Sequence, residues 1–161
     1  MKKASYGRKD RLIKNKRGDA YRESTKLPEP TVCIKCGALF SDGRWTWKEV
    51  PQNSNQSICP ACRRIEDDYP AGFITVGGKF FKDHQKDVLG LIHNIEKQEK
   101  TKRPLERIMN INSENNHLLI TTTGVHIARR IGEALSRSFK GELEFQYADG
   151  EKIIRVNWSR Q

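Results

Sequence analysis

Two short runs, Cys33-Ile34-Lys35-Cys36-Gly37 and Cys59-Pro60-Ala61-Cys62-Arg63, decide how the first half of this chain folds. Each run holds two cysteines separated by two residues, and these four are the only cysteines in the sequence. Two such knuckles can supply four thiolates to one tetrahedral metal ion. Zinc suits four soft ligands because it imposes no geometry of its own. We therefore expect a zinc ribbon over residues 29–76, with Cys33, Cys36, Cys59 and Cys62 as the ligands.

Four thiolates leave no open coordination position, so the expected zinc is structural and not catalytic. The alternative is a pair of thioredoxin-type dithiol motifs. Such a motif requires a βαβ scaffold with a helix that starts after the first cysteine, whereas here Gly37 follows one knuckle and the other lies in a turn-rich segment. The sequence also contains no P-loop, dinucleotide fingerprint or convincing nucleophile-and-base set, and we expect no enzyme.

Positive charge is concentrated at the N-terminus. The 161 residues carry a formal net charge of +10, and residues 1–26 contribute +7 of it, with ten Lys or Arg against three Asp or Glu. Such a block is typical of nucleic-acid arms, although a solvated terminus that aids solubility is the alternative. We expect a basic arm over residues 1–28, with the following cations on phosphates: Lys2, Lys3, Arg8, Lys9, Arg11, Lys14, Lys16 and Arg17.

The composition limits the size of any core and argues against a membrane. Hydrophobic residues make up 35% of the chain and the mean hydropathy is −0.77, which fits two small domains better than one large core. No apolar run is long enough to span a bilayer, and the charged start does not resemble a signal peptide. We expect a cytoplasmic protein with no membrane partner.

Several segments have clear secondary-structure signals, and together they predict the α+β class. In the ribbon, residues 38–40 and 44–47 read as strands around the turn signal Ser41-Asp42-Gly43, and residues 51–57 read as a loop. Residues 77–103 read as a helical connector, with Val88, Leu91, Ile92 and Ile95 on one face of a helix over residues 82–100. The pattern does not decide whether this helix is a spacer or packs on a neighbouring module.

Residues 104–161 predict a small ββαββ module. Strands are expected at 107–111, 118–122, 143–147 and 154–158, with Asp149-Gly150 as a hairpin turn. The helix between them is expected over residues 124–139 with Thr122 or Thr123 as its cap. The helix would turn one apolar stripe toward the sheet: Val125, Ala128, Ile131, Leu135 and Phe139.

Some residues outside the arm are also candidates for nucleic-acid contact. Trp45 and Trp47, beside Arg44, would be stacking platforms for bases or else the cover of the thiolate cluster. Arg63 and Arg64 would stabilise the thiolates or reach phosphate. Arg130 and Arg137 belong to an outward helix stripe that an ordinary solvated face explains equally well. The four histidines lack metal-ligand spacing to one another and are expected to be ordinary side chains.

The two knuckles, the helix after them and the module from Leu105 to Trp158 resemble the N-terminal half of the nonsense-mediated decay protein 3 family. The best-matching stretch is Leu118-Leu119-Ile120-Thr121-Thr122-Thr123-Gly124-Val125-His126-Ile127-Ala128, which resembles that family's strand-then-helix segment. The chain is also similar to short bacterial zinc-ribbon proteins that share Tyr69-Pro70-Ala71-Gly72 and Pro104-Leu105-Glu106-Arg107-Ile108. The full family members have more cysteines and further domains, so functions such as nuclear export are not implied.

The resemblance implies a zinc module beside a small α/β module, used on the ribosome or on RNA. Together with the clustered charge, it predicts a zinc-stabilised RNA-binding protein that associates with the ribosome or its large subunit, with ribosomal RNA or a ribosomal protein as its partner. A DNA-binding zinc-ribbon regulator is the first alternative. A protein-interaction adaptor that does not bind nucleic acid is the second. The oligomeric state is left open.

Overall fold

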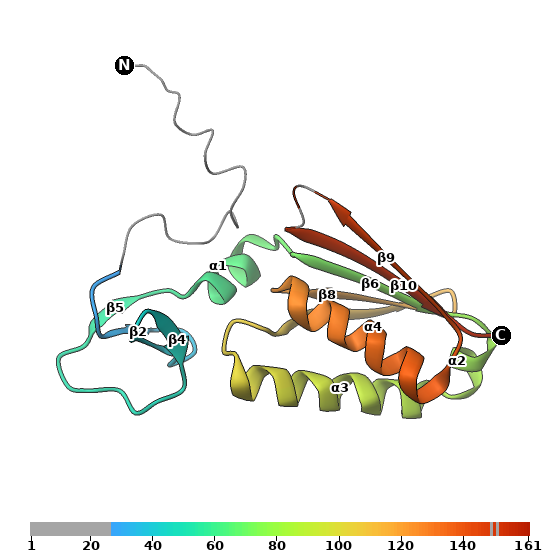
Figure 1. Ribbon diagram of the computed structural model, residues 1–161, viewed down its shortest axis with the longest axis horizontal. Helices are drawn as coiled ribbons and strands as arrows, with labels where there is room; N and C mark the ends of the chain where they lie inside the picture. The colour runs from blue at the N-terminus through green and yellow to red at the C-terminus, as the bar shows by residue number, and fades with distance from the viewer. Residues whose placement is uncertain (1–26, 149, 151) are drawn as a thin grey trace, which may run out of the picture.

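Two β-sheets organise the residues that the structure describes, which are 27–148, 150 and 152–161. The structure is a computed structural model. The smaller sheet lies at one end of the molecule, and the larger sheet runs from there to the C-terminus with helices on one of its faces (Figure 1). The expected α+β class is confirmed.

The smaller sheet has the strand order β4-β3-β2-β5. The bounds of its strands are β2 Thr31–Cys33, β3 Leu39–Ser41, β4 Arg44–Thr46 and β5 Asn55–Ser57. Between β3 and β4, Asp42 and Gly43 have φ values of 56° and 80°, as a two-residue type I′ turn requires. The segment expected to be a loop contains β5, which pairs in parallel with β2 although its residues are polar.

Helix α1 (Pro60–Asp67) leads from the smaller sheet to the larger one. Pro60 occupies the first turn, where its missing N–H costs nothing, and Asp68 ends the helix in the left-handed conformation. The chain then enters β6 (Gly72–Gly77). The sequence pattern predicts residues 72–76 as part of the ribbon, but they lie in the middle of the larger sheet.

The larger sheet has the strand order β7-β8-β6-β10-β9. Strand β6 pairs antiparallel with β8 and parallel with β10, so the ββαββ description lacks its central strand. The alternating pattern of Ile74-Thr75-Val76 predicts a strand but does not indicate which sheet the strand joins, because its partner strands are distant in sequence. The remaining strand bounds are β7 Ile108–Glu114, β8 His117–Thr122, β9 Glu142–Ala148 and β10 Ile153–Ser159.

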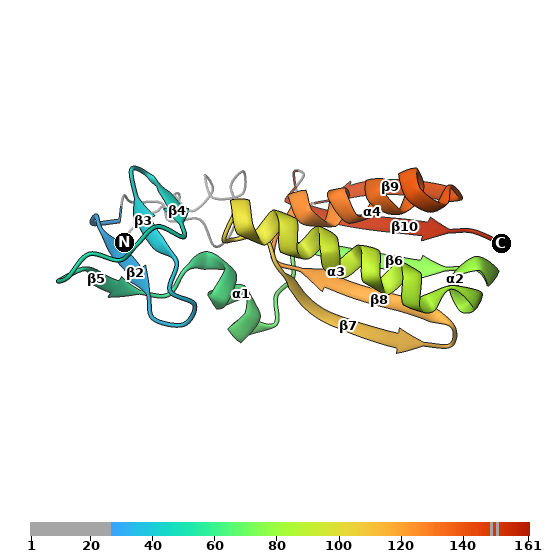
Figure 2. The same cartoon turned by 90° about the horizontal axis from the view of Figure 1, so that it is seen from below.

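Three helices connect strands of this sheet: α2 (Lys79–Asp83) and α3 (Gln85–Lys102) lie between β6 and β7, and α4 (Val125–Phe139) lies between β8 and β9. Figure 2 shows α3 and α4 side by side over one face of the sheet. The helical connector is therefore part of the larger layer and not a spacer. Its predicted apolar face is buried at three of four positions, and the fourth, Leu91, is half-buried: Val88, Ile92 and Ile95 join the core with Ile131 and Leu135 of α4.

Two local predictions differ from the structure or lie outside it. Gly124 is the cap residue of α4 and makes no side-chain capping bond; the Thr122 hydroxyl donates instead to the Gly124 carbonyl at 2.8 Å. Asp149 of the expected hairpin turn lies outside the described residues, although β9 and β10 pair with Ala148 opposite Ile153. In the described part of the chain, no helix combines the length and apolarity needed to cross a bilayer.

Candidate metal centre

The four cysteines come from two elements that meet at the end of the smaller sheet. Cys33 ends β2, and Cys36 lies in the turn that follows, which closes with a bond from the Gly37 N–H to the Cys33 carbonyl at 2.9 Å. Cys59 is the N-cap of α1, and Cys62 lies in the first turn of that helix. The Cys59 Sγ accepts a hydrogen bond from the Cys62 N–H at 3.4 Å. The helix start therefore directs the second pair of thiols toward the first.

The sulfur positions fit a tetrahedral ion. All four Sγ atoms lie within 4.8 Å of one another, and the Cys33–Cys62 and Cys36–Cys59 Sγ pairs are each 3.8 Å apart. A tetrahedral zinc with Zn–S bonds of about 2.3 Å places its sulfurs about 3.8 Å apart. A disulfide would need about 2.05 Å, and all four cysteines are free. The four thiols can therefore hold a metal ion, and their softness favours zinc.

The cluster is shielded from water on most sides. Cys33, Cys59 and Cys62 are buried and Cys36 is partly exposed. Ala38, Ala61, Trp45, Ile58 and Leu105 surround the sulfurs. A four-thiolate shell in such surroundings offers no position for a substrate, so its chemistry is structural.

Burial and hydrogen bonds from backbone N–H groups shift the pKa values of these thiols in opposite directions. Burial raises the pKa of the Cys59 and Cys62 thiols. For Cys33, burial also raises the pKa, but backbone hydrogen bonds from Cys59, Cys36 and Lys35 outweigh it and lower the value to about 7. Binding of a metal ion would therefore release protons from Cys59 and Cys62, whose pKa values are raised.

Arg107, which is not among the site residues predicted from the sequence, contacts this cluster from the position directly before β7. Its side chain is buried, with 6% of the residue exposed. The guanidinium donates to Cys36 Sγ at 3.0 Å, to Cys62 Sγ at 3.3 Å and to Cys59 Sγ at 3.5 Å. Its Nε donates to the Pro104 carbonyl at 2.7 Å. A divalent ion with four thiolates carries a net charge of −2, and Arg107 offsets half of it.

The backbone of Arg107 is fixed by Thr123, the residue before the N-cap of α4. The Arg107 N–H donates to the Thr123 hydroxyl at 2.8 Å, and the Thr123 N–H donates to the Arg107 carbonyl at 2.9 Å. The cation is thus placed by the larger sheet and its helix. No local pattern separates Arg107 from the other 29 Lys and Arg residues, and its neighbours Leu105 and Ile108 are the sole hint of burial.

The two tryptophans of the ribbon have different roles. Trp45 packs against the thiol cluster and against Phe40, with ring centroids 5.4 Å apart, as the covering interpretation expects. Trp47 lies beyond the end of β4 and remains 38% exposed. Its indole N–H donates to the Lys100 carbonyl of α3 at 2.7 Å, and the Arg107 guanidinium carbon lies 5.9 Å from its ring centroid. Trp47 therefore connects the ribbon to the larger layer.

The predicted nucleic-acid residues that the structure describes lie on different elements. Arg44 is exposed on β4, and Arg63 is exposed on α1 with its Nε donating to the Ile58 carbonyl at 3.1 Å. Arg64 is buried, with 3% exposed, and donates to the Tyr69 carbonyl at 2.9 Å, which fits a structural role. Arg137 is exposed near the end of α4. The eight cations predicted in the arm, from Lys2 to Arg17, lie outside the described residues.

Arg130 and His126 meet a buried carboxylate. Glu99 of α3 is 4% exposed and binds Arg130 Nε at 3.0 Å, Arg103 at 3.1 Å and His126 Nε2 at 2.9 Å. Desolvation raises the Glu99 pKa, but the hydrogen bond from Arg130 and the charges of His126, Arg130 and Arg103 outweigh it, and the net shift is downward. Arg130 and His126 of the outward stripe therefore contribute to α3–α4 packing, whereas Arg137 of the same stripe faces solvent.

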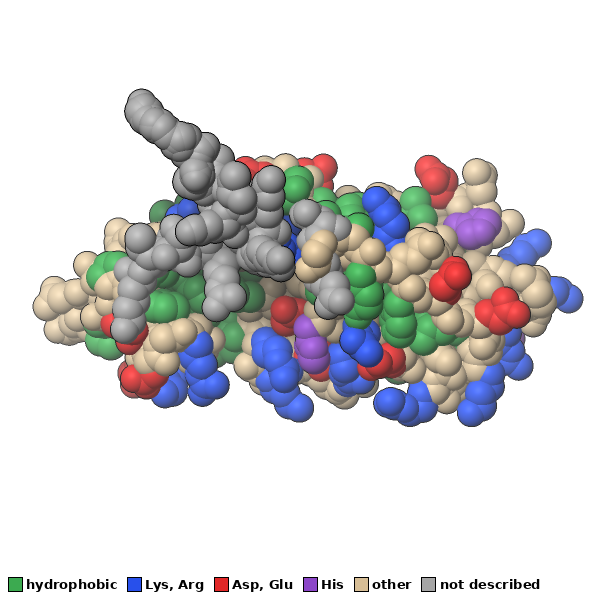
Figure 3. Space-filling view, turned by 45° about the horizontal axis from the view of Figure 1, so that its top comes forward, with side chains coloured by type: hydrophobic (Ala, Val, Ile, Leu, Met, Phe, Trp, Pro, Cys, Tyr) green, Lys and Arg blue, Asp and Glu red, His purple; other side chains and the backbone are tan. Residues whose placement is uncertain are grey.

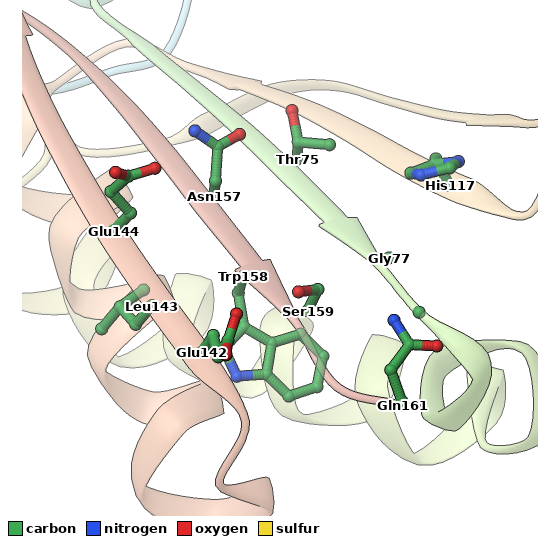
Figure 4. A pocket seen from close by; sticks show the side chains of 11 residues that line it. Thr75, Gly77, His117, Glu142, Leu143, Glu144, Asn157, Trp158, Ser159 and Gln161 are labelled. Atoms are coloured by element: carbon green, nitrogen blue, oxygen red, sulfur yellow. The ribbon is translucent and has the colours of Figure 1, made fainter.

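The uncovered face of the larger sheet carries a polar groove. It has a volume of about 640 Å³ near the C-terminal end of β10. Figure 4 shows Glu144, Asn157 and Thr75 across three neighbouring strands, with His117 beyond them, whereas Leu143 and Trp158 lie on the helix side. The carboxylates of Glu142 and Glu144 also line this groove and would repel phosphate.

Comparison of the chain with protein-family models, with curated proteins and with solved structures found no match. The resemblance to the nonsense-mediated decay protein 3 family therefore stays an expectation from sequence.

Proposed function

We propose that this chain is a zinc-stabilised RNA-binding protein that associates with the ribosome or its large subunit. The observation that carries the proposal is a closed four-thiolate cluster in a chain whose net charge is +10. A closed metal site stabilises a small scaffold without providing chemistry. An excess of Lys and Arg provides the electrostatic attraction that dominates nonspecific nucleic-acid binding.

Cations on the described surface support the proposal independently of the arm. The exposed sides of α3 and α4 carry them from end to end, and Figure 3 shows Lys and Arg side chains along the lower edge of the molecule, where α3 lies in Figure 1. The exposed cations of these helices are Lys86, Lys97, Lys100, Lys102, Arg129 and Arg137.

The resemblance described above selects the ribosome among possible RNA partners. Zinc is favoured among metals because four thiolates at tetrahedral spacing match its preferences. The arm over residues 1–28 would add contacts to phosphates.

Sedimentation of the tagged chain from its own cell lysate tests this function. The lysate is separated on sucrose gradients at low and at high salt, and the ribosomal fractions are probed for the chain. We expect co-migration with a subunit at low salt and release at high salt, because each phosphate contact is lost as salt rises. Deletion of residues 1–26 should reduce the salt dependence. A chain that stays at the top of the gradient at low salt would refute ribosome association.

The same preparation separates the alternatives. A preference for duplex DNA over structured RNA would select the DNA-binding regulator. Salt-insensitive binding to a protein, without affinity for nucleic acid, would select the adaptor. Metal content measured on the purified chain should show about one zinc per chain, and replacement of Cys59 and Cys62 by serine should abolish it.

A further inference from the structure

A groove with a volume of about 410 Å³ runs along the junction between the ribbon and the helical layer. The ribbon contributes Arg44, Trp47 and Lys48 to it, and the segment that ends α3 contributes Lys102 and Arg103. These two elements are joined by the bond from the Trp47 indole to the Lys100 carbonyl. The volume falls within the range of about 300–1,000 Å³ that is usual for ligand sites.

Trp47 is held in place and yet accessible. Its N–H is bound to the backbone of α3, and the buried Arg107 guanidinium lies over its ring. The residue as a whole is nevertheless 38% exposed, and it lines the groove. A large aromatic side chain that is fixed before a ligand arrives loses little entropy on binding. An exposed ring of this kind can stack on an unpaired base of any identity.

The charges around this ring favour an anion. Arg44 and Lys102 form no ion pair with another described residue, and both are exposed. Lys48 is 3.8 Å from Asp42, an exposed pair that contributes little, and Arg103 shares Glu99 with Arg130 and His126. The carboxylate in the lining, Glu106, accepts a hydrogen bond from the Ile127 N–H at the start of α4 at 2.9 Å. The junction groove is therefore basic, in contrast to the groove on the open face of the sheet.

We propose that the junction groove binds single-stranded RNA, with one unpaired base stacked on Trp47 and the flanking phosphates on Arg44, Lys48, Lys102 and Arg103. This inference rests on the proposed function and assigns it a binding site. An unpaired strand is required because a base in a duplex has no free face for Trp47. The groove joins both modules, so the same strand contacts the ribbon and the helical layer.

Fluorescence anisotropy with the full zinc-loaded chain tests the site. The probe is a fluorescein-labelled oligouridine of about ten nucleotides, near the middle of the site sizes seen for single-strand binders. Trp47→Ala should weaken binding about 5- to 150-fold, the equivalent of one lost stacking contact. Trp47→Phe loses the hydrogen bond to Lys100 but keeps an aromatic face, and it should retain most of the affinity. Zinc content and thermal unfolding of both variants report whether the junction remains folded.

A pair of charge variants provides the matched control. Arg44→Gln with Lys102→Gln removes two groove cations, whereas Lys79→Gln with Lys82→Gln removes two exposed cations of α2, at the end of the molecule away from the groove (Figure 1). The groove pair should reduce the slope of log affinity against log salt by about 1.4, and the control pair should leave it unchanged. A duplex RNA of the same length should compete less well than the single strand.

The possible results distinguish failure of the groove proposal from failure of the proposed RNA-binding function. Equal affinity of Trp47→Ala and the wild type would overturn the groove proposal, as would identical salt slopes for the two charge pairs. Equal losses for Trp47→Phe and Trp47→Ala would assign Trp47 a structural role and would also overturn it. If the wild-type chain binds no RNA at low salt, the proposed function itself fails.

Discussion

Replacement of Arg107 by methionine tests whether the larger sheet stabilises the metal centre. Methionine fills much of the same volume but cannot donate to sulfur or carry charge. The wild-type guanidinium contacts three of the four Sγ atoms at 3.0–3.5 Å and is 6% exposed. Its loss would leave a buried thiolate cluster of net charge −2 without its nearest cation.

The magnitude follows from two independent estimates. Removing one partner of a buried ion pair costs about 3–5 kcal/mol. Removing an outer-shell partner of a metal ligand typically weakens metal binding about 10- to 100-fold, or about 1.4–2.8 kcal/mol. Sulfur is a weak acceptor and Cys36 is partly exposed, so we take the value at which the two ranges meet, about 3 kcal/mol. We therefore expect Arg107→Met to weaken zinc binding on the order of 100-fold.

Competition with a chromophoric chelator measures this affinity directly. Arg107→Lys keeps the charge but has no planar fork, and it should lose an intermediate amount. Arg129→Met is the control, because Arg129 is exposed and binds Glu133 and the Tyr147 hydroxyl, and it makes no hydrogen bond to a cysteine among the described residues. Zinc affinity of Arg107→Met equal to that of Arg129→Met would refute the coupling between the sheet and the metal centre.

Three further predictions concern stability. Chelation of the metal should remove on the order of 10 kcal/mol of folding free energy from the ribbon and unfold residues 29–71. Amide hydrogen exchange should then become fast in the ribbon and stay slow in the larger sheet, and slow exchange retained in the ribbon after verified metal removal would contradict this prediction. Glu99→Gln should cost about 1–3 kcal/mol at neutral pH in urea unfolding. The pKa of Glu99 is lower in the folded state than its unfolded value of about 4.5, so ionised Glu99 stabilises the fold above that pH and loses this effect as pH falls through the folded pKa. The difference in unfolding free energy between Glu99→Gln and wild type should therefore shrink below about pH 4.5. A constant difference down to about pH 2 would argue against the ion-pair account. Gly90→Ala should raise stability by about 0.5–1 kcal/mol, because a Cβ at this position of α3 meets open space. Gly132→Ala should lower stability by about 1–3 kcal/mol, because its Cβ would lie 2.7 Å from Val156 on β10. Equal effects of the two variants in thermal unfolding would contradict the packing of α4.

The metal site was predictable because its signal is local. Cysteine pairs at a fixed spacing identify the metal-binding residues directly, and in the structure the four sulfurs lie close together. The face of α3 was predictable for a similar reason, since Val88, Ile92 and Ile95 follow the helical period. Glu99 continues that face as a buried carboxylate, which a hydrophobic pattern cannot anticipate because its partner Arg130 lies on another helix.

The placement of β6 and the role of Arg107 could not be derived in the same way. Ile74 and Val76 alternate with polar positions, and this pattern indicates a strand without naming its neighbours. The parallel partner β10 follows after three helices and three strands have intervened. Arg107 differs from the other described cations through its buried contacts with the thiols, which come from a distant part of the chain. Both misses concern long-range contacts, to which local patterns carry no information.

The parallel pairing of β6 with β10 has a consequence for biosynthesis. Gly72 pairs with Ile154 and Val76 with Trp158, so one edge of β6 stays open until the ribosome has made β10. Domains fold from the N-terminal side as they are synthesised. The ribbon can therefore load its metal before Arg107 and the rest of the sheet exist. An incomplete chain would combine a finished ribbon with a bare strand edge, a form vulnerable to aggregation and to proteases.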